Sequence, residues 1–176
     1  MGSLLGDFVK GKPDSRFSAE TCSGIWLHRA IDEFTDRHPT VRESKALMSS
    51  QRRRFAGIIV DICYDHFLCR NWNQYSTIAL SNFSEQVYAS LNGYDGFLPE
   101  QANFVIQRLT TEDWLQSYQS ISGISSVLNR VSKRTQRINL LYGSGEELIQ
   151  NYDALNHHFM TFFPDLIQFV HQHEHR

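Results

Sequence analysis

The sequence is poor in cysteine and proline and has no long hydrophobic run. Its three cysteines, Cys22, Cys63 and Cys69, are an odd number without a C-x-x-C pair, which argues against a disulfide scaffold or a zinc knuckle and favours a reducing compartment. Runs such as 55–60 fall far short of the roughly 20 residues of a spanning helix, and no secretory signal pattern is present. We therefore expect a soluble, cytoplasmic protein without a membrane partner.

Neither sign of charge is in excess. Seventeen Lys and Arg face nineteen Asp and Glu, for a net charge of -2. Nucleic-acid binding needs a strong basic excess, so we expect no nucleic-acid partner. Only four prolines and ten glycines stand beside 22 aromatic residues (12 Phe, 7 Tyr, 3 Trp), a composition that excludes a disordered or collagen-like chain.

Hydrophobic residues recur at helical spacing, and no segment alternates with a period of two. Residues 1–17 read as a loop. Helices are predicted over 18–38, 39–50, 52–72, 80–91 and 100–109, then around Trp114 and over 121–131. A last long helix starts at Glu146, with Ser144 as its cap, and Pro164 is expected to end or kink it. The length suits one domain, so the prediction is an all-α, single-domain helical bundle over 1–176.

Polar side chains interrupt the hydrophobic face of the first long helix. His28, Asp32 and Asp36 are spaced four residues apart, so they form one strip along the helix. Asp7 is a further carboxylate in an otherwise hydrophobic stretch, and Gly6 before it permits a close backbone approach.

A second polar group interrupts the predicted helix over 52–72. Asp61 and Asp65 are four residues apart and His66 follows directly. Carboxylates near a core are costly unless they are paired or bind a metal. Imidazole with carboxylate suits Mn²⁺, Fe²⁺ or Zn²⁺, with Mg²⁺ less well suited. A metal ion there would polarise a phosphoryl oxygen and lower the pKa of a coordinated water. The plainer interpretation is a set of ordinary i,i+4 helix pairs.

A basic run, Arg52 to Arg54, stands out on this slightly acidic chain. Most such runs are solvated helix faces. The functional interpretation is a docking site for an acidic partner, because rim charges steer association. Nucleotide-binding glycine motifs and a serine nucleophile elbow do not occur.

Several of these segments together resemble the acyl carrier protein phosphodiesterase family. The segments are Leu4 to Gly11, His28 to Asp32, Thr35-Asp36, Asp61 to Leu68, Tyr152 to Leu155 and Phe162 to Pro164. The resemblance implies a helical enzyme, distantly related to the HD-domain metal phosphohydrolases, that removes the 4'-phosphopantetheine arm from holo-acyl carrier protein, commonly with manganese.

The resemblance also suggests roles for particular residues. A divalent metal, Mn²⁺ with Mg²⁺ or Fe²⁺ as alternatives, is expected on four ligands: His28, Asp32, Asp65 and His66. Catalytic roles are expected for Asp7 and Asp61, as further ligands or general bases, and for Arg29, as a partner of the phosphate oxygens. The acidic carrier protein gives Arg52, Arg53 and Arg54 a docking role.

Two alternatives stay open at the level of sequence. One is an HD-like phosphohydrolase acting on a nucleotide or another small phosphodiester. The other is a helical module that binds an acidic carrier protein without turnover. The second is favoured because the family usually has a histidine-containing stretch ahead of the Leu4 to Gly11 segment, whereas this sequence begins almost at Leu4.

Overall fold

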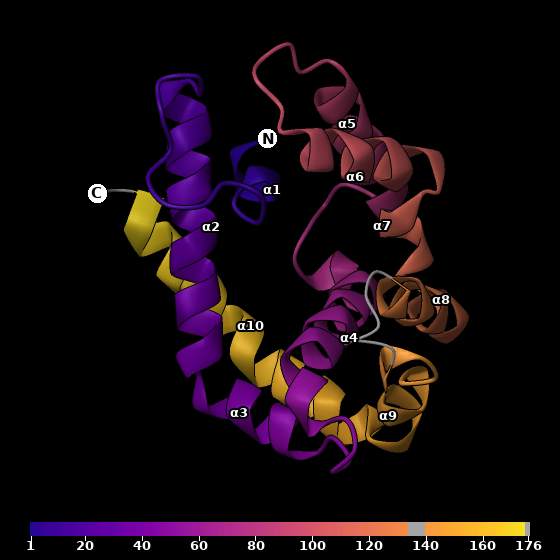
Figure 1. Ribbon diagram of the computed structural model, residues 1–176. Helices are drawn as coiled ribbons and strands as arrows, with labels where there is room; N and C mark the ends of the chain where they lie inside the picture. The colour runs from indigo at the N-terminus through magenta and orange to yellow at the C-terminus, as the bar shows by residue number, and fades with distance from the viewer. Residues whose placement is uncertain (134–139, 175–176) are drawn as a thin grey trace.

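The described part of the chain, residues 1–133 and 140–174 of a computed structural model, is helical and contains no strand. This confirms the predicted all-α fold class. The helices (Figure 1) are α1 (Gly2–Leu5), α2 (Ala19–Arg37), α3 (Pro39–Ala46), η1 (Arg53–Phe55), α4 (Ala56–Arg70), η2 (Trp72–Gln74), α5 (Leu80–Asn92), α6 (Glu100–Thr111), α7 (Trp114–Ser117), α8 (Ile121–Ser132), α9 (Gly145–Gln150) and α10 (Tyr152–Glu174).

The boundaries of α2 follow from local sequence signals. The Ser18 side chain accepts a hydrogen bond from the Thr21 backbone N–H and so caps the first turn. The helix ends before His38, which is extended because Pro39 follows it. Pro39 then occupies the first turn of α3, where its missing N–H has no cost. The residues His38 and Pro39 therefore determine the turn between α2 and α3 locally.

Helix α4 is the centre of the bundle (Figure 1). It packs against α3, α8 and α10, and eight of its fifteen residues are buried. A helix that is hydrophobic nearly all round belongs in a core, so Asp61 and Asp65 are exceptions that need an explanation. No helix in the described part of the chain is long and apolar enough to cross a membrane.

Two separate hydrophobic clusters hold the fold together. The larger one surrounds α4 and includes the buried rings of Phe67 and Phe159. The smaller one joins α1, α2 and α6 through Leu5, Ile25 and Ala102. Helices from both clusters face the cavities described below, so the site lies where the two parts of the bundle meet.

The structure differs from the predicted helices in four places. The expected loop at the start contains α1. The predicted last helix is two helices, α9 and α10, separated at Asn151. Ser144 does not cap α9, because its hydroxyl donates to the Leu141 carbonyl. Pro164 lies inside α10 and does not end it. Packing of α10 against α2, α3 and α4 compensates for the hydrogen bond that proline removes.

Candidate active site

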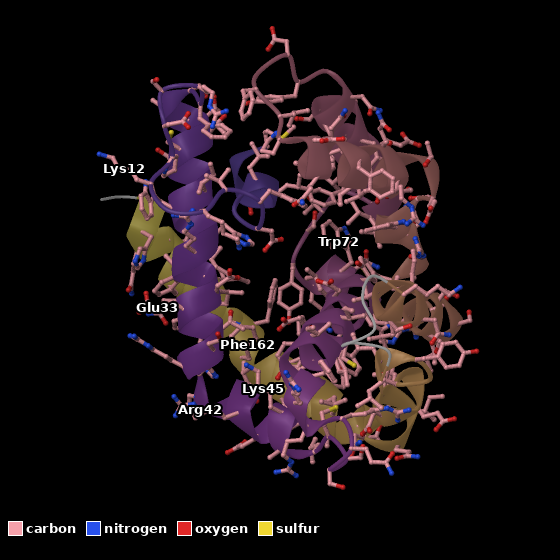
Figure 2. All side chains as sticks on the ribbon, in the orientation of Figure 1. Lys12, Glu33, Arg42, Lys45, Trp72 and Phe162 are labelled. Carbon is pink, nitrogen blue, oxygen red and sulfur yellow. The ribbon has the colours of Figure 1, made fainter. Side chains whose placement is uncertain are left out.

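A cavity of about 440 Å³ lies between α2 and α4, with α10 as its floor. Figure 2 shows Phe162 of that floor between the two helices. The walls are acidic and the floor is hydrophobic. The lining side chains are Asp7, His28, Ile31, Asp32, Thr35, Asp36, Asp61, Tyr64, Asp65, Leu68, Phe159, Phe162, Phe163 and Leu166.

Three side chains converge at one edge of this cavity. The His28 Nε2 atom lies 3.2 Å from Asp7 Oδ1 and 3.2 Å from Asp32 Oδ2. One donor atom from each of the three residues lies within 4.8 Å of the others, which is close enough for a single cation. The imidazole is 19% exposed, whereas the two carboxyl groups are 69% and 60% exposed. A ligand from solvent can therefore reach this Asp7–His28–Asp32 cluster.

Close backbone packing brings Asp7 to α2. Gly2 of α1 lies against Gly24 of α2, and a Cβ on either residue would meet the other backbone at 2.8 Å. A Cβ on Gly6 would overlap the His28 ring. The sequence interpretation of Gly6 as a point of close approach is thus confirmed, and the glycine lets Asp7 Oδ1 come within 3.2 Å of His28 Nε2.

Asp61 and Asp65 face the same cavity from α4. Burial raises the pKa of Asp61 to about 6, and the charges of Asp36 and Asp32 add to the increase, while Lys45 opposes it. Burial and the neighbouring Asp61 raise the pKa of Asp65 to about 7. Asp65 is accessible from the cavity, and a carboxyl that titrates near neutral pH is what a general acid or base requires.

The surroundings of the cluster strengthen proton binding at His28 and Asp32. The hydrogen bond to Asp7 raises the pKa of His28, and the charge of Asp32 adds to this, although desolvation opposes it. Burial raises the pKa of Asp32. A cation bound at these three groups would displace the His28 proton and relieve the repulsion among the carboxylates.

Comparison with known proteins decides the family. A model of the acyl carrier protein phosphodiesterase family matches residues 1–166. A protein named acyl carrier protein phosphodiesterase from Escherichia coli O6:H1 (strain CFT073) is 37% identical over 172 residues, 95% of this chain and 87% of that protein. One of the same name from Photorhabdus laumondii is 32% identical over 169 residues, 96% of this chain and 85% of that protein.

This chain belongs to the acyl carrier protein phosphodiesterase family. No solved structure matches it significantly, so the likeness of its bundle to HD-domain phosphohydrolases remains a prediction. The resemblance recognised in the sequence is confirmed.

His66 was predicted as a metal ligand of this phosphodiesterase-family site, but the structure does not bring it there. Its ring is 1% exposed, with Nδ1 2.7 Å from the Tyr118 carbonyl and Nε2 3.1 Å from the Tyr152 hydroxyl. The roughly 100° between successive helix residues turns it away from Asp65. We therefore remove it from the ligand set and regard it as a link between α4, the end of α7 and α10.

Arg29 also lies elsewhere than predicted. Its two terminal nitrogens donate to the carbonyls of Gly11, at 2.7 Å, and Val9, at 2.5 Å, and the guanidinium lies over the Trp26 ring. Arg29 does not line the cavity. It fastens the loop that follows Asp7 to α2, so it acts by positioning and not by contacting a phosphate.

The three arginines predicted to dock a partner, Arg52 to Arg54, have different surroundings in the structure. Arg52 donates to Glu147, a carboxylate 3% exposed, and to the carbonyls of Leu140 and Tyr142. This buried pair is structural, because removing one partner would leave a buried charge. Arg53 and Arg54 are exposed and remain available to a partner.

Sequence reasoning missed Lys45. Its ammonium lies 2.7 Å from Asp36 and lowers the pKa of Asp61. Figure 2 labels it on α3, beside the lower part of α4. No spacing rule relates Lys45 to Asp36, because the turn between α2 and α3 brings them together. Lys45 is the cation that partly offsets the acidic wall.

Substituting Gly6 tests how Asp7 and His28 are placed. In Gly6→Ala the new methyl group overlaps the His28 ring and displaces it, so Mn²⁺ affinity should fall by roughly tenfold or more, as for loss of orientation at a metal ligand. Titration followed by Mn²⁺ electron paramagnetic resonance measures this. The control is Gly57→Ala, whose Cβ meets only the Lys45 side chain at 3.8 Å. Wild-type affinity in Gly6→Ala would contradict the placement.

Substituting Asp65 tests the raised pKa. Burial raises the pKa of its carboxyl to about 7, well above the ordinary value of an aspartate, so the folded state binds the proton more tightly and metal-free stability falls as pH rises from about 4 to about 7. Asp65→Asn should remove this loss and raise stability at pH 8 by roughly 1 kcal/mol, a Tm gain of a few degrees.

Thermal unfolding in a chelator between pH 5 and pH 8 measures the effect. Asp95→Asn, at an exposed loop position, is the control and should leave the pH profile unchanged. Parallel profiles for wild type and Asp65→Asn would show that the carboxyl is ionised as freely as in water.

Proposed function

We propose that this protein hydrolyses the phosphodiester that joins 4'-phosphopantetheine to a serine of acyl carrier protein, giving the apo-carrier. The observation that supports this most directly is the convergence of Asp7, His28 and Asp32 in the cavity that also holds Asp65, in a chain that the family model matches over residues 1–166. The substrate is proposed from the printed name of the family.

The donor set of the cluster fits a divalent cation. Two carboxylates and one imidazole, with donor atoms within 4.8 Å of one another, suit Mn²⁺, with Fe²⁺ or Mg²⁺ as alternatives. Such an ion would neutralise charge on the phosphate and polarise its phosphorus–oxygen bonds. Asp7, His28 and Asp32 would hold it, which differs from the predicted set of His28, Asp32, Asp65 and His66.

The reaction adds water across the bond between phosphorus and the serine oxygen. The water oxygen bonds to phosphorus, the serine oxygen leaves, and the phosphate stays on the arm. Asp65 is suited to accept the water proton and return one to the serine oxygen, because a pKa of about 7 allows both states at neutral pH. Asp61, with a pKa of about 6, shares the negative charge of this wall.

The hydrophobic floor strengthens these interactions. Phe159 and Phe162 are 1% and 3% exposed, and Phe163 continues the floor beside them. Charges beside such a surface interact more strongly than charges in open water. In the proposed site a bound cation, and not an arginine side chain, would hold the anionic phosphate.

The proposal includes where the enzyme works. A carrier protein of fatty acid biosynthesis is cytoplasmic, and we propose the cytoplasm for this enzyme too. The alternatives, hydrolysis of a small phosphodiester or nucleotide and binding without turnover, are decided by the same assay.

The direct test incubates the purified protein with holo-acyl carrier protein and Mn²⁺ and follows the carrier by mass spectrometry. The wild type should convert holo-carrier to apo-carrier, and Asp32→Asn should lower kcat/KM by at least roughly a hundredfold, because a charged donor of the cation is lost. Glu33→Gln is the matched control on the same helix. Glu33 points away from the cavity and pairs with Arg37 (Figure 2).

An unchanged carrier mass with the wild type and Mn²⁺ present would contradict the proposed function. Turnover of a nucleotide panel without carrier turnover would favour the small-substrate enzyme. Stoichiometric carrier binding without any turnover would favour the binding module.

The exposed pair Arg53 and Arg54 gives a test of docking. The pair belongs to η1, directly before the helix that carries Asp61 and Asp65, so it is placed to meet an acidic carrier protein whose serine is in the cavity. Replacing both with glutamine should raise KM for holo-carrier several-fold without changing kcat. Turnover of bis(p-nitrophenyl) phosphate is the control and should not change. If the double variant and the wild type have the same KM at low salt, Arg53 and Arg54 do not belong to the docking surface.

A further inference from the structure

A second cavity of about 670 Å³ opens beside the acidic one. Both cavities are lined by Asp7, His28 and Asp65, so they meet at the proposed reaction centre. The remaining lining comes mainly from α1, α5, α6 and α7. These side chains are Met1, Ser3, Leu4, Phe8, Phe83, Val87, Leu91, Val105, Leu109, Trp114, Leu115 and Tyr118. We call this cavity the apolar chamber.

The chamber has one polar end. Asp7, His28 and Asp65 are its charged side chains, and most of the walls beyond them carry aliphatic and aromatic side chains, with the hydroxyls of Ser3 and Tyr118 as further polar side-chain groups. None of the lining residues is a lysine or arginine that could bind a second phosphate, and none is an asparagine or glutamine that could read a nucleobase. A matching ligand has a phosphate at one end and a neutral, largely apolar body at the other.

The helices that form the chamber wall have little other role in the site. Helices α5, α6 and α7 pack mainly on one another and form the upper right part of Figure 1, whereas α2, α4 and α10 line the acidic cavity. Val87, Val105 and Leu109 are only partly buried, so they leave hydrophobic surface toward the chamber. Such surface is costly in water and is typical of a ligand site.

We propose that the apolar chamber binds the pantetheine arm of the substrate, with Val87 of α5 and Leu109 of α6 as residues that contact it. This rests on the proposed function and adds the direction in which the substrate lies. The arm is an uncharged chain with a dimethyl group and amides, which fits these walls. The volume lies within the range of small-molecule sites, so the folded carrier protein stays outside, on the side of the acidic cavity.

The chamber separates the two products. The phosphate of the released arm lies between Asp7, His28 and Asp65, and its chain lies against α5 and α6. The apo-carrier leaves from the acidic side without passing the arm.

The experiment measures product binding directly. Free 4'-phosphopantetheine and inorganic phosphate are titrated into the full-length, Mn²⁺-loaded protein by calorimetry. The wild type should bind 4'-phosphopantetheine at least roughly tenfold more tightly than phosphate, because the arm adds apolar contact. Leu109→Trp fills the chamber and should remove that excess while phosphate binding stays unchanged. Val87→Trp fills it from α5 and should do the same.

Phe104→Trp is the matched control. Phe104 lies on the same helix, is 59% exposed and does not line the chamber, so this variant should keep the tenfold preference. Equal affinity of the wild type for the two ligands would overturn the proposal. A preference that persists in both Leu109→Trp and Val87→Trp, with their circular dichroism unchanged, would overturn it as well.

The outcome is separable from the proposed function. If the wild type releases no arm from holo-carrier, the proposed reaction is wrong. The calorimetric titrations still show whether the chamber binds the arm. If it releases the arm and both chamber variants do so with unchanged kcat/KM, the reaction stands and the chamber assignment is wrong. A loss of kcat/KM on holo-carrier with intact turnover of bis(p-nitrophenyl) phosphate supports both.

Discussion

The constraint on which this structure depends is the repulsion among several carboxylates that lie together beside a hydrophobic floor. Asp7, Asp32, Asp61 and Asp65 line one cavity with a single imidazole, His28. Burial and mutual repulsion raise the pKa of three of these carboxyls. An arrangement of this kind destabilises the empty protein, and a bound cation reverses the sign of the effect. The proposed divalent cation would relieve this repulsion before any substrate arrives.

The bundle places this charge where two differently built parts meet. Helices α2, α4 and α10 supply the acidic walls and the aromatic floor. Helices α5, α6 and α7 supply the apolar chamber on the other side of Asp7, His28 and Asp65. A phosphodiester has two substituents, and this division gives each one its own side. Chemistry and selection of the arm thus come from separate helices.

The sequence predicted the fold class and the polar helix faces because both depend on residues within two turns of one another. The i,i+4 spacing of His28 and Asp32 predicts a contact, and in the structure His28 Nε2 lies 3.2 Å from Asp32 Oδ2. Contacts between distant segments have no local signal. Three residues therefore have partners that their predicted roles did not anticipate. His66 contacts Tyr118 and Tyr152, Arg29 donates to the carbonyls of Val9 and Gly11, and Arg52 pairs with Glu147.

Anomalous diffraction from crystals of the protein soaked in Mn²⁺ tests the central claim most directly. The account predicts one strong peak bounded by Asp7, His28 and Asp32, with metal–donor distances near 2.0–2.3 Å, roughly those of divalent ions on nitrogen and oxygen. A peak that has none of these three residues as ligands, or a fully occupied metal held by His66, would contradict it.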